Sequence, residues 1–120
     1  MPSSSIKIIF GGVVPGYPLP KLEEFLSVLE KGGVKDIDTA QLYWDSEKLL
    51  GDVNAASRFS IDTKHIGGSK PGESTKEKVI ARGEKSLADL QTKPVSPVPI
   101  YSMMEQVDEA TGRCFLHSCA

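Results

Sequence analysis

The chain has 120 residues, with 14 basic and 16 acidic side chains and a net charge of −2. That balance argues against a nucleic-acid-binding arm or a polybasic membrane surface, because both need clustered positive charge. A hydrophobic fraction of 39% and a charged fraction of 25% are typical of a globular chain, and no apolar run approaches the roughly 20 residues that span a bilayer. The N-terminus has no signal-peptide pattern, and two cysteines, Cys114 and Cys119, make no disulfide framework. We therefore expect a cytoplasmic protein.

The first predicted strand covers residues 6–10, whose side chains are mostly β-branched or aromatic, and it ends at Gly11-Gly12. The prolines and glycine between residues 15 and 20 predict an irregular loop. From Lys21 the apolar residues follow helical spacing, which predicts a helix. Gly32-Gly33 should end that helix through a left-handed C-terminal cap.

The second predicted strand covers residues 34–40, and Asp45-Ser46 is a plausible N-cap for a short helix after it. Residues 58–64 alternate in polarity, which predicts a third strand. Residues 74–77 form a capping-box pattern that should open a helix reaching Leu90. Strands that alternate with helices predict an α/β fold with parallel strands and crossover helices.

The composition changes near residue 92. Residues 93–99 contain three prolines, which exclude a helix and a central strand there. We therefore divide the chain into residues 1–92, which carry the α/β pattern, and a divergent tail, residues 93–120. We expect the tail to be poorly ordered.

Three residues with complementary chemistry lie at the ends of predicted strands. Asp38 lies near the end of the second strand, Tyr43 in the loop after it, and Lys64 at the end of the third. In parallel α/β folds these ends meet on the side where active sites form, and the alternation of the third strand turns Lys64 to the face where Asp38 could meet it. An ammonium lowers the pKa of a nearby phenol, ordinarily about 10, and a carboxylate holds the lysine charged. The trio could therefore protonate a carbonyl oxygen as hydride reaches its carbon.

A family resemblance supports this chemistry. Residues 37–43, followed by Ser46-Glu47-Lys48-Leu49-Leu50-Gly51, resemble the D-T-A-x-x-Y…S-E-x-x-L-G signature of aldo-keto reductases. Residues 59–64 are similar to the strand that carries the catalytic lysine of that family. The opening strand and the Asp-Thr-Lys triplet are most similar to the aflatoxin-aldehyde-reductase-like branch. The resemblance covers roughly residues 6–92.

The resemblance implies a partial TIM (β/α)8 barrel, of which this chain supplies about the first three β/α units, with NADP as the cofactor. It implies a small aldehyde or ketone as the substrate. Asp38 would pair with the lysine and lie beside the nicotinamide ribose. Tyr43 would donate the proton, and Lys64 would adjust the acidity of the Tyr43 hydroxyl. Gly11 and Gly12 could line the nicotinamide pocket, although a strand-ending turn explains both glycines equally well.

The sequence departs from the family in two ways. The catalytic histidine of the family follows on the fourth strand, but residues 94–101 hold no histidine in that place, and His117 comes too late in the chain. A complete barrel needs about 250 residues. We therefore expect a truncated chain that is inactive as it stands. The alternative is a non-catalytic product or an interaction module that associates with itself through open sheet edges.

Other reactive side chains have plain structural explanations. His65 follows Lys64 and should point to the opposite side of the strand. His117 and the two cysteines near it lack a fourth ligand, so we expect no metal site. Residues 67–70 lack the spacing of a phosphate-binding loop and predict a flexible connection. Trp44 could line a substrate pocket or pack as an ordinary aromatic residue.

Overall fold

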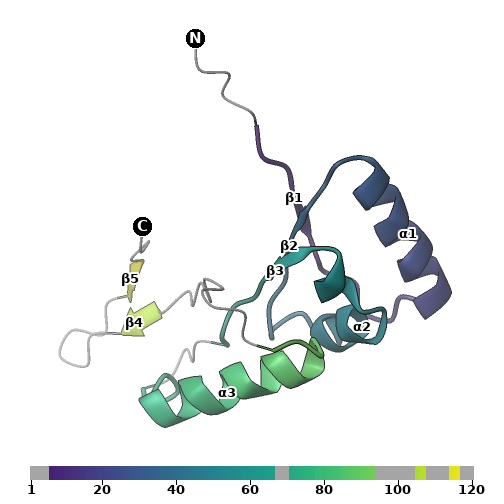
Figure 1. Ribbon diagram of the computed structural model, residues 1–120. Helices are drawn as coiled ribbons and strands as arrows, with labels where there is room; N and C mark the ends of the chain where they lie inside the picture. The colour runs from purple at the N-terminus through teal and green to yellow at the C-terminus, as the bar shows by residue number, and fades with distance from the viewer. Residues whose placement is uncertain (1–5, 67–70, 94–104, 108–113, 117–120) are drawn as a thin grey trace.

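The computed structural model describes residues 6–66, 71–93, 105–107 and 114–116 (Figure 1). A three-stranded sheet lies at its centre, in the order β1 (Ile9–Gly11), β2 (Asp36–Asp38) and β3 (Ser60–Asp62). Both strand pairs are parallel, and Ile37 lies opposite Phe10 on one side and Ile61 on the other. The predicted parallel arrangement is confirmed.

Helices connect the strands in the predicted order. Helix α1 (Leu19–Lys31) joins β1 to β2, and α2 (Ser46–Asp52) with the short 3-10 turn η1 (Ala55–Ser57) joins β2 to β3. Helix α3 (Lys76–Asp89) follows β3 (Figure 1). The α/β class predicted from the sequence is therefore confirmed, with three strand–helix units in succession.

Helix α1 begins at Leu19, two residues before the predicted start at Lys21. Pro18 is the N-cap residue and Pro20 lies in the first turn. Proline is tolerated there because the first backbone N–H groups of a helix have no partner within the helix. The prolines that predicted an irregular loop therefore belong in part to the helix start.

The predicted glycine cap at the end of α1 is confirmed. Gly33 has a φ of +84°, in the left-handed region that glycine adopts at little cost. Its N–H donates to the carbonyl of Glu30, and the N–H of Val34 donates to the carbonyl of Leu29, each at 3.0 Å. These two bonds satisfy carbonyl groups that the end of the helix leaves open.

Helix α3 has a simpler start than the predicted capping box. The N-cap residue is Thr75, whose Oγ1 accepts the N–H of Lys78 at 3.4 Å. Glu77 is therefore the second helical residue, one position too early for the reciprocal bond of a capping box. The predicted box is wrong, and the helix start has a one-sided threonine cap.

The core lies between the sheet and the helices. Alternation along β2 buries Ile37 completely and turns Asp36 and Asp38 to the other face. Leu22 and Leu26, one helical turn apart on α1, are also fully buried. The buried hydrophobic cluster comprises Val14, Leu22, Leu26, Ile37, Leu50, Ala55, Phe59 and Leu90. Among the described residues, the other face of the sheet carries charged side chains, including those of Asp36 and Asp38.

A second, two-stranded sheet lies in the predicted tail. Strands β4 (Glu105–Val107) and β5 (Cys114–Leu116) pair in antiparallel fashion. Local sequence patterns do not predict this pair, because neither run alternates strongly in polarity. The remaining tail residues after Lys93, including His117 and Cys119, lie outside the described residues, so poor order of the tail stays a prediction.

Candidate active site

Asp38 and Lys64 form an ion pair at the carboxyl end of the sheet. The pairing of β2 with β3 places Asp38 opposite Asp62, and Lys64 follows two residues later on the same side of the chain. The ammonium also donates to the carbonyl of Thr39 at 3.1 Å. The side chain of Lys64 is 23% exposed and that of Asp38 is 41% exposed, so the pair is open to solvent and to a ligand. The structure therefore brings these two predicted residues together.

Tyr43 lies beside that pair. The Nζ atom of Lys64 is 5.7 Å from the centroid of its ring, within the roughly 6 Å at which a cation attracts an aromatic face. A tight turn sets the position of the tyrosine, because its N–H donates to the carbonyl of Ala40 and its own carbonyl accepts the N–H of Ser46, both at 3.0 Å. All three predicted catalytic residues thus lie at one end of the sheet, while their catalytic roles remain predictions.

The two glycines predicted to bind cofactor have different surroundings. Gly12 is buried, and a Cβ atom there would lie 2.7 Å from the Cγ2 of Ile37. Its N–H donates to the carbonyl of Asp38 at 2.8 Å, so close packing of neighbouring strand ends explains this glycine. Gly11 is exposed, and a Cβ there would meet nothing within 4 Å. Only Gly11 therefore faces open space where a ligand could approach.

The predicted cap of α2 serves another purpose. Asp45 is the N-cap residue by position, but its side chain makes no capping bond and instead accepts the N–H of Gly16 at 3.3 Å. The buried hydroxyl of Ser46 accepts the N–H of Val14 at 2.9 Å. These two residues therefore fasten the loop after β1 to the loop after β2, close to the candidate site.

Glu47 is a site-supporting residue that the sequence analysis did not single out. Its side chain is buried in α2, and its carboxyl accepts a hydrogen bond from the hydroxyl of Thr63. Thr63 immediately precedes Lys64, so this bond ties the end of β3 to a helix. Ser46-Glu47 is part of the motif that resembles the aldo-keto reductase signature, but the motif does not indicate which residue the glutamate contacts.

Further charges share the open face of the sheet. The Nζ of Lys7 lies 2.8 Å from a carboxylate oxygen of Asp36, in the row beside the Asp38–Lys64 pair. Burial raises the pKa of Asp62 above its usual value; Lys7 opposes that rise, and the carboxylates of Asp36 and Asp38 add to it. This face therefore carries the carboxyl groups of Asp36, Asp38 and Asp62 together with the ammonium groups of Lys7 and Lys64.

Trp44 has an unusual backbone conformation. Its φ is +53°, and its side chain is 78% exposed. A bulky residue in the left-handed region is uncommon and strained, and such strain often occurs at functional sites. The interpretation of Trp44 as a packed aromatic residue is wrong, while a position in a substrate pocket stays a prediction.

His65, which alternation predicts to point away from Lys64, is buried, with 8% of its surface exposed. Within the described part of the chain, neither ring nitrogen has a hydrogen-bond partner. Burial lowers the pKa of this imidazole, the nearby Arg82 lowers it further, and Glu73 opposes the change. The side chain is therefore kept neutral in the fold.

We expect a pH-dependent loss of stability from His65. Because its folded-state pKa lies below the ordinary 6.5, the unfolded chain takes up a proton first, and stability is lost as the pH falls below about 6.5. Urea unfolding at pH values from 7.5 to 5 should show a steeper decline for the wild type than for His65→Phe, by up to about 1.4 kcal/mol per pH unit. Parallel declines in the two proteins would refute the assignment.

Metal and membrane sites receive no support from the described residues. No group of three or more His, Cys, Asp or Glu side chains in these ranges is placed to hold a metal ion. In the same ranges, no helix combines the length and the apolar character needed to cross a membrane. His117, for which we predicted no metal site, lies outside them.

Comparisons with known proteins agree with this architecture. No family model matches the chain. The oxidoreductase sirO of Leptosphaeria maculans is 36% identical over 74 residues, which cover 60% of this chain and 22% of that protein. A Pseudomonas aeruginosa protein assigned as an aldo-keto reductase superposes with a TM-score of 0.60 at 24% identity, covering 72% of this chain and 38% of that one. The holo form of an aldo-keto reductase from Bacillus halodurans gives 0.58 at 22% identity, covering 72% and 32%.

The matches cover only part of each known protein. The chain spans 22% of the curated relative and between 32% and 38% of these two solved structures. The shared part holds parallel strands alternating with helices, and the solved neighbours are aldo-keto reductases with TIM barrels. The α/β portion of this chain therefore has the fold of one part of an aldo-keto reductase barrel.

Proposed function

We propose that this chain carries the proton-donating part of an NADP(H)-dependent aldo-keto reductase, of the aflatoxin-aldehyde-reductase-like branch and of cytoplasmic location. The reaction is reduction of a small aldehyde or ketone to an alcohol. The observation that carries the proposal is the ion pair of Lys64 with Asp38, with Tyr43 beside it at the carboxyl end of a parallel sheet. Parallel α/β barrels place their active sites at this end.

The chemistry follows from these three side chains. The Asp38 carboxylate pairs with the Lys64 ammonium and holds it in place. The Lys64 ammonium lies 5.7 Å from the centre of the tyrosine ring, and a cation beside the ring stabilises the negative charge that develops on the phenol oxygen as the proton leaves. Tyr43 then transfers its hydroxyl proton to the carbonyl oxygen while the carbonyl carbon accepts hydride, so the product alcohol gains both.

The residues present fit the nicotinamide end of such a cofactor. When bound, NADPH supplies the hydride. The open space beside Gly11 lets a flat group approach the strand ends, and the half-exposed carboxylate of Asp38 can accept a hydrogen bond from a ribose hydroxyl. Gly12 lets the two strand ends pack closely, and its contact with the cofactor stays a prediction.

Titration of the purified chain with NADPH, followed by cofactor fluorescence and by carbonyl-dependent oxidation, tests the proposal. Saturable binding, with carbonyl-dependent oxidation that Tyr43→Phe lowers by at least about 100-fold, would mean that the chain assembles a working site, because loss of a general acid typically costs that much. No binding would mean that the chain is inactive as it stands. Binding should change little, since the substitution removes only a hydroxyl group. Equal and measurable oxidation rates in wild type and variant would exclude Tyr43 as the donor.

A second candidate function is a non-catalytic interaction module. Large apolar side chains are exposed near the outer strand β1 and in the loop after β2, among them Ile8 at 66%, Ile9 at 48% and Leu42 at 69%. An unpaired strand edge next to apolar surface invites association. Absence of NADPH binding, together with a concentration-dependent increase in mass by sedimentation, would favour this function over the reductase.

A further inference from the structure

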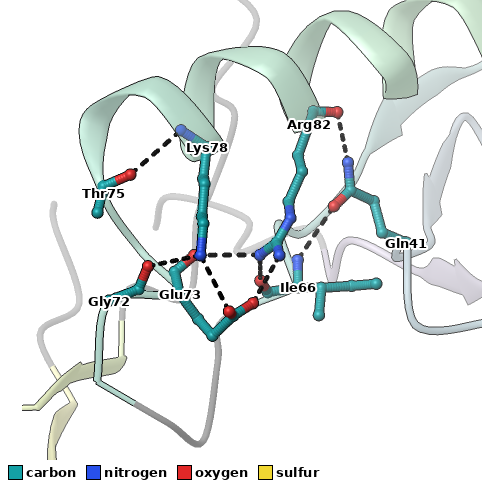
Figure 2. Close-up of polar contacts among 7 residues, drawn as sticks. All are labelled: Gln41, Ile66, Gly72, Glu73, Thr75, Lys78 and Arg82. Atoms are coloured by element: carbon teal, nitrogen blue, oxygen red, sulfur yellow. Dashed lines mark hydrogen bonds and ion pairs between the residues drawn. The ribbon is translucent and has the colours of Figure 1, made fainter.

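The backbone N–H of Gln41 and both polar atoms of its side chain make hydrogen bonds, to the segment after β3 and to helix α3 (Figure 2). Its backbone N–H donates to the carbonyl of Lys64 at 3.2 Å. Its side-chain oxygen accepts the N–H of Ile66 at 3.1 Å. Its side-chain nitrogen donates to the carbonyl of Arg82 and, at 2.7 Å, to the buried hydroxyl of Ser86. One residue thus joins the loop after β2, the segment after β3 and helix α3.

These bonds continue the sheet beyond its regular end. Strand β3 ends at Asp62, whose carbonyl accepts the N–H of Thr39 at 2.8 Å. The next bond in that row is the one from Gln41 to Lys64. The side chain of Gln41 then adds a further bond by accepting the N–H of Ile66, beyond the last paired residue of the strand. Lys64 is therefore held in a sheet-like conformation outside the sheet proper.

Helix α3 also anchors the segment that follows β3. The guanidinium of Arg82 donates to the carbonyl of Ile66 at 2.7 Å and pairs with the Glu73 carboxylate at 2.8 Å. Glu73 also accepts from Lys78 at 3.0 Å (Figure 2). Hydrogen bonds from these two cations hold the pKa of Glu73 below its usual value. Because Gln41 binds the carbonyl of Arg82 itself, the amide and the guanidinium form one connected network.

We propose that Gln41 is a positioning residue, which holds the backbone around Lys64 so that its ammonium meets Asp38 and faces Tyr43. The inference rests on the proposed function, since the position of Lys64 matters for catalysis only if Tyr43 donates the proton. A purely structural role, in which Gln41 only docks α3, predicts a different result. In that case its loss would lower overall stability without a selective effect on Lys64.

Ammonium hydrogen exchange separates the two roles. In a chain labelled with 15N-lysine, the Lys64 ammonium signal is assigned by its loss in Lys64→Arg. Gln41→Met keeps the length of the side chain but removes its hydrogen bonds, and we expect about fivefold faster exchange with water at Lys64, as expected for the loss of about 1 kcal/mol of restraint. The ammonium groups of Lys48 and Lys85, which pair with Asp52 and Asp89 within their helices, should be unchanged.

Two further variants control for stability and folding. Ser86→Ala removes one bond between Gln41 and α3 but leaves the bond to Ile66, so exchange at Lys64 should stay within about twofold of the wild type. Gln41→Glu keeps an acceptor for Ile66 and should protect Lys64 even if Gln41→Met fails to fold. An unchanged signal in Gln41→Met, equal acceleration at all three lysines, or unprotected Lys64 in Gln41→Glu would overturn the proposal.

These readouts require no cofactor, so they stand apart from the proposed function. If the chain binds no NADPH but Gln41→Met loosens Lys64 alone, the positioning effect holds and the reductase assignment fails. If the chain reduces carbonyls, Gln41→Met should lower kcat more than it raises KM, because the binding surface near Gly11 is untouched. A change in KM alone would count against positioning of Lys64.

Discussion

Gly51→Ala should destabilise the fold by about 3 kcal/mol, at the upper end of the usual cost of overpacking a core. A Cβ atom on Gly51 would lie 2.0 Å from the carbonyl oxygen of Asp89 and 3.0 Å from the carbonyl carbons of Asp89 and Leu90. These are backbone atoms, so no side-chain rotation relieves the clash, and α2 must move away from the end of α3. Urea unfolding followed by circular dichroism measures the free energy of unfolding directly.

The matched control is Gly83→Ala. Gly83 lies within α3, where a Cβ would meet nothing within 4 Å. Alanine at a compatible helical position should stabilise the chain by about 0.5–1 kcal/mol. Opposite signs for the two substitutions would establish that contact between α2 and α3 requires Gly51. A Gly51→Ala chain as stable as the wild type would show that the two helices do not pack as closely as described.

Local patterns in the sequence were sufficient to predict the succession of strands and helices. Buried Ile37 between two aspartates and the glycine pair after α1 each depend on near neighbours in the chain. Alternation and capping depend on residues close together in the chain, so both can be recognised from the sequence alone. The start of α1 was misplaced for the opposite reason. Prolines suit both a loop and a first helical turn, and the choice between them depends on what the turn packs against.

The candidate site was predictable in its reactive groups but not in its supports. Asp38 and Lys64 could be paired because parallel strand ends must meet on one side of the sheet. The partners of Ser46 and Gln41 lie 32 and 45 residues away in the chain, at Val14 and Ser86, and no local pattern links such positions. Polar side chains find their partners only after tertiary packing has brought the segments together.

The supports have a common geometry. Lys64 lies just beyond the last paired residue of β3, where regular strand bonds no longer hold the chain. The residue before it is bonded to Glu47 in α2, and Gln41 bonds the backbone on both sides of His65. A long and flexible lysine side chain can be placed accurately only if its backbone is fixed. The helices around the sheet therefore determine where the ammonium lies.

The bond between Thr63 and Glu47 should be the most sensitive of these supports. Thr63→Val preserves the shape of the side chain but removes the hydroxyl that donates to the buried carboxyl. A buried acceptor left without its donor costs about 2–3 kcal/mol, more than the net gain from an average hydrogen bond. Urea unfolding of the single variant should show a loss of that size.

A double-mutant cycle distinguishes the loss of this bond from a general loss of packing. Glu47→Met should cost about 1 kcal/mol, since it leaves only the half-buried hydroxyl of Thr63 without its partner. The double variant should be more stable than Thr63→Val alone, because it removes the buried acceptor together with the donor. Additive losses would mean that the two side chains are not coupled. A positive coupling would show that α2 holds the strand end from which Lys64 reaches Asp38.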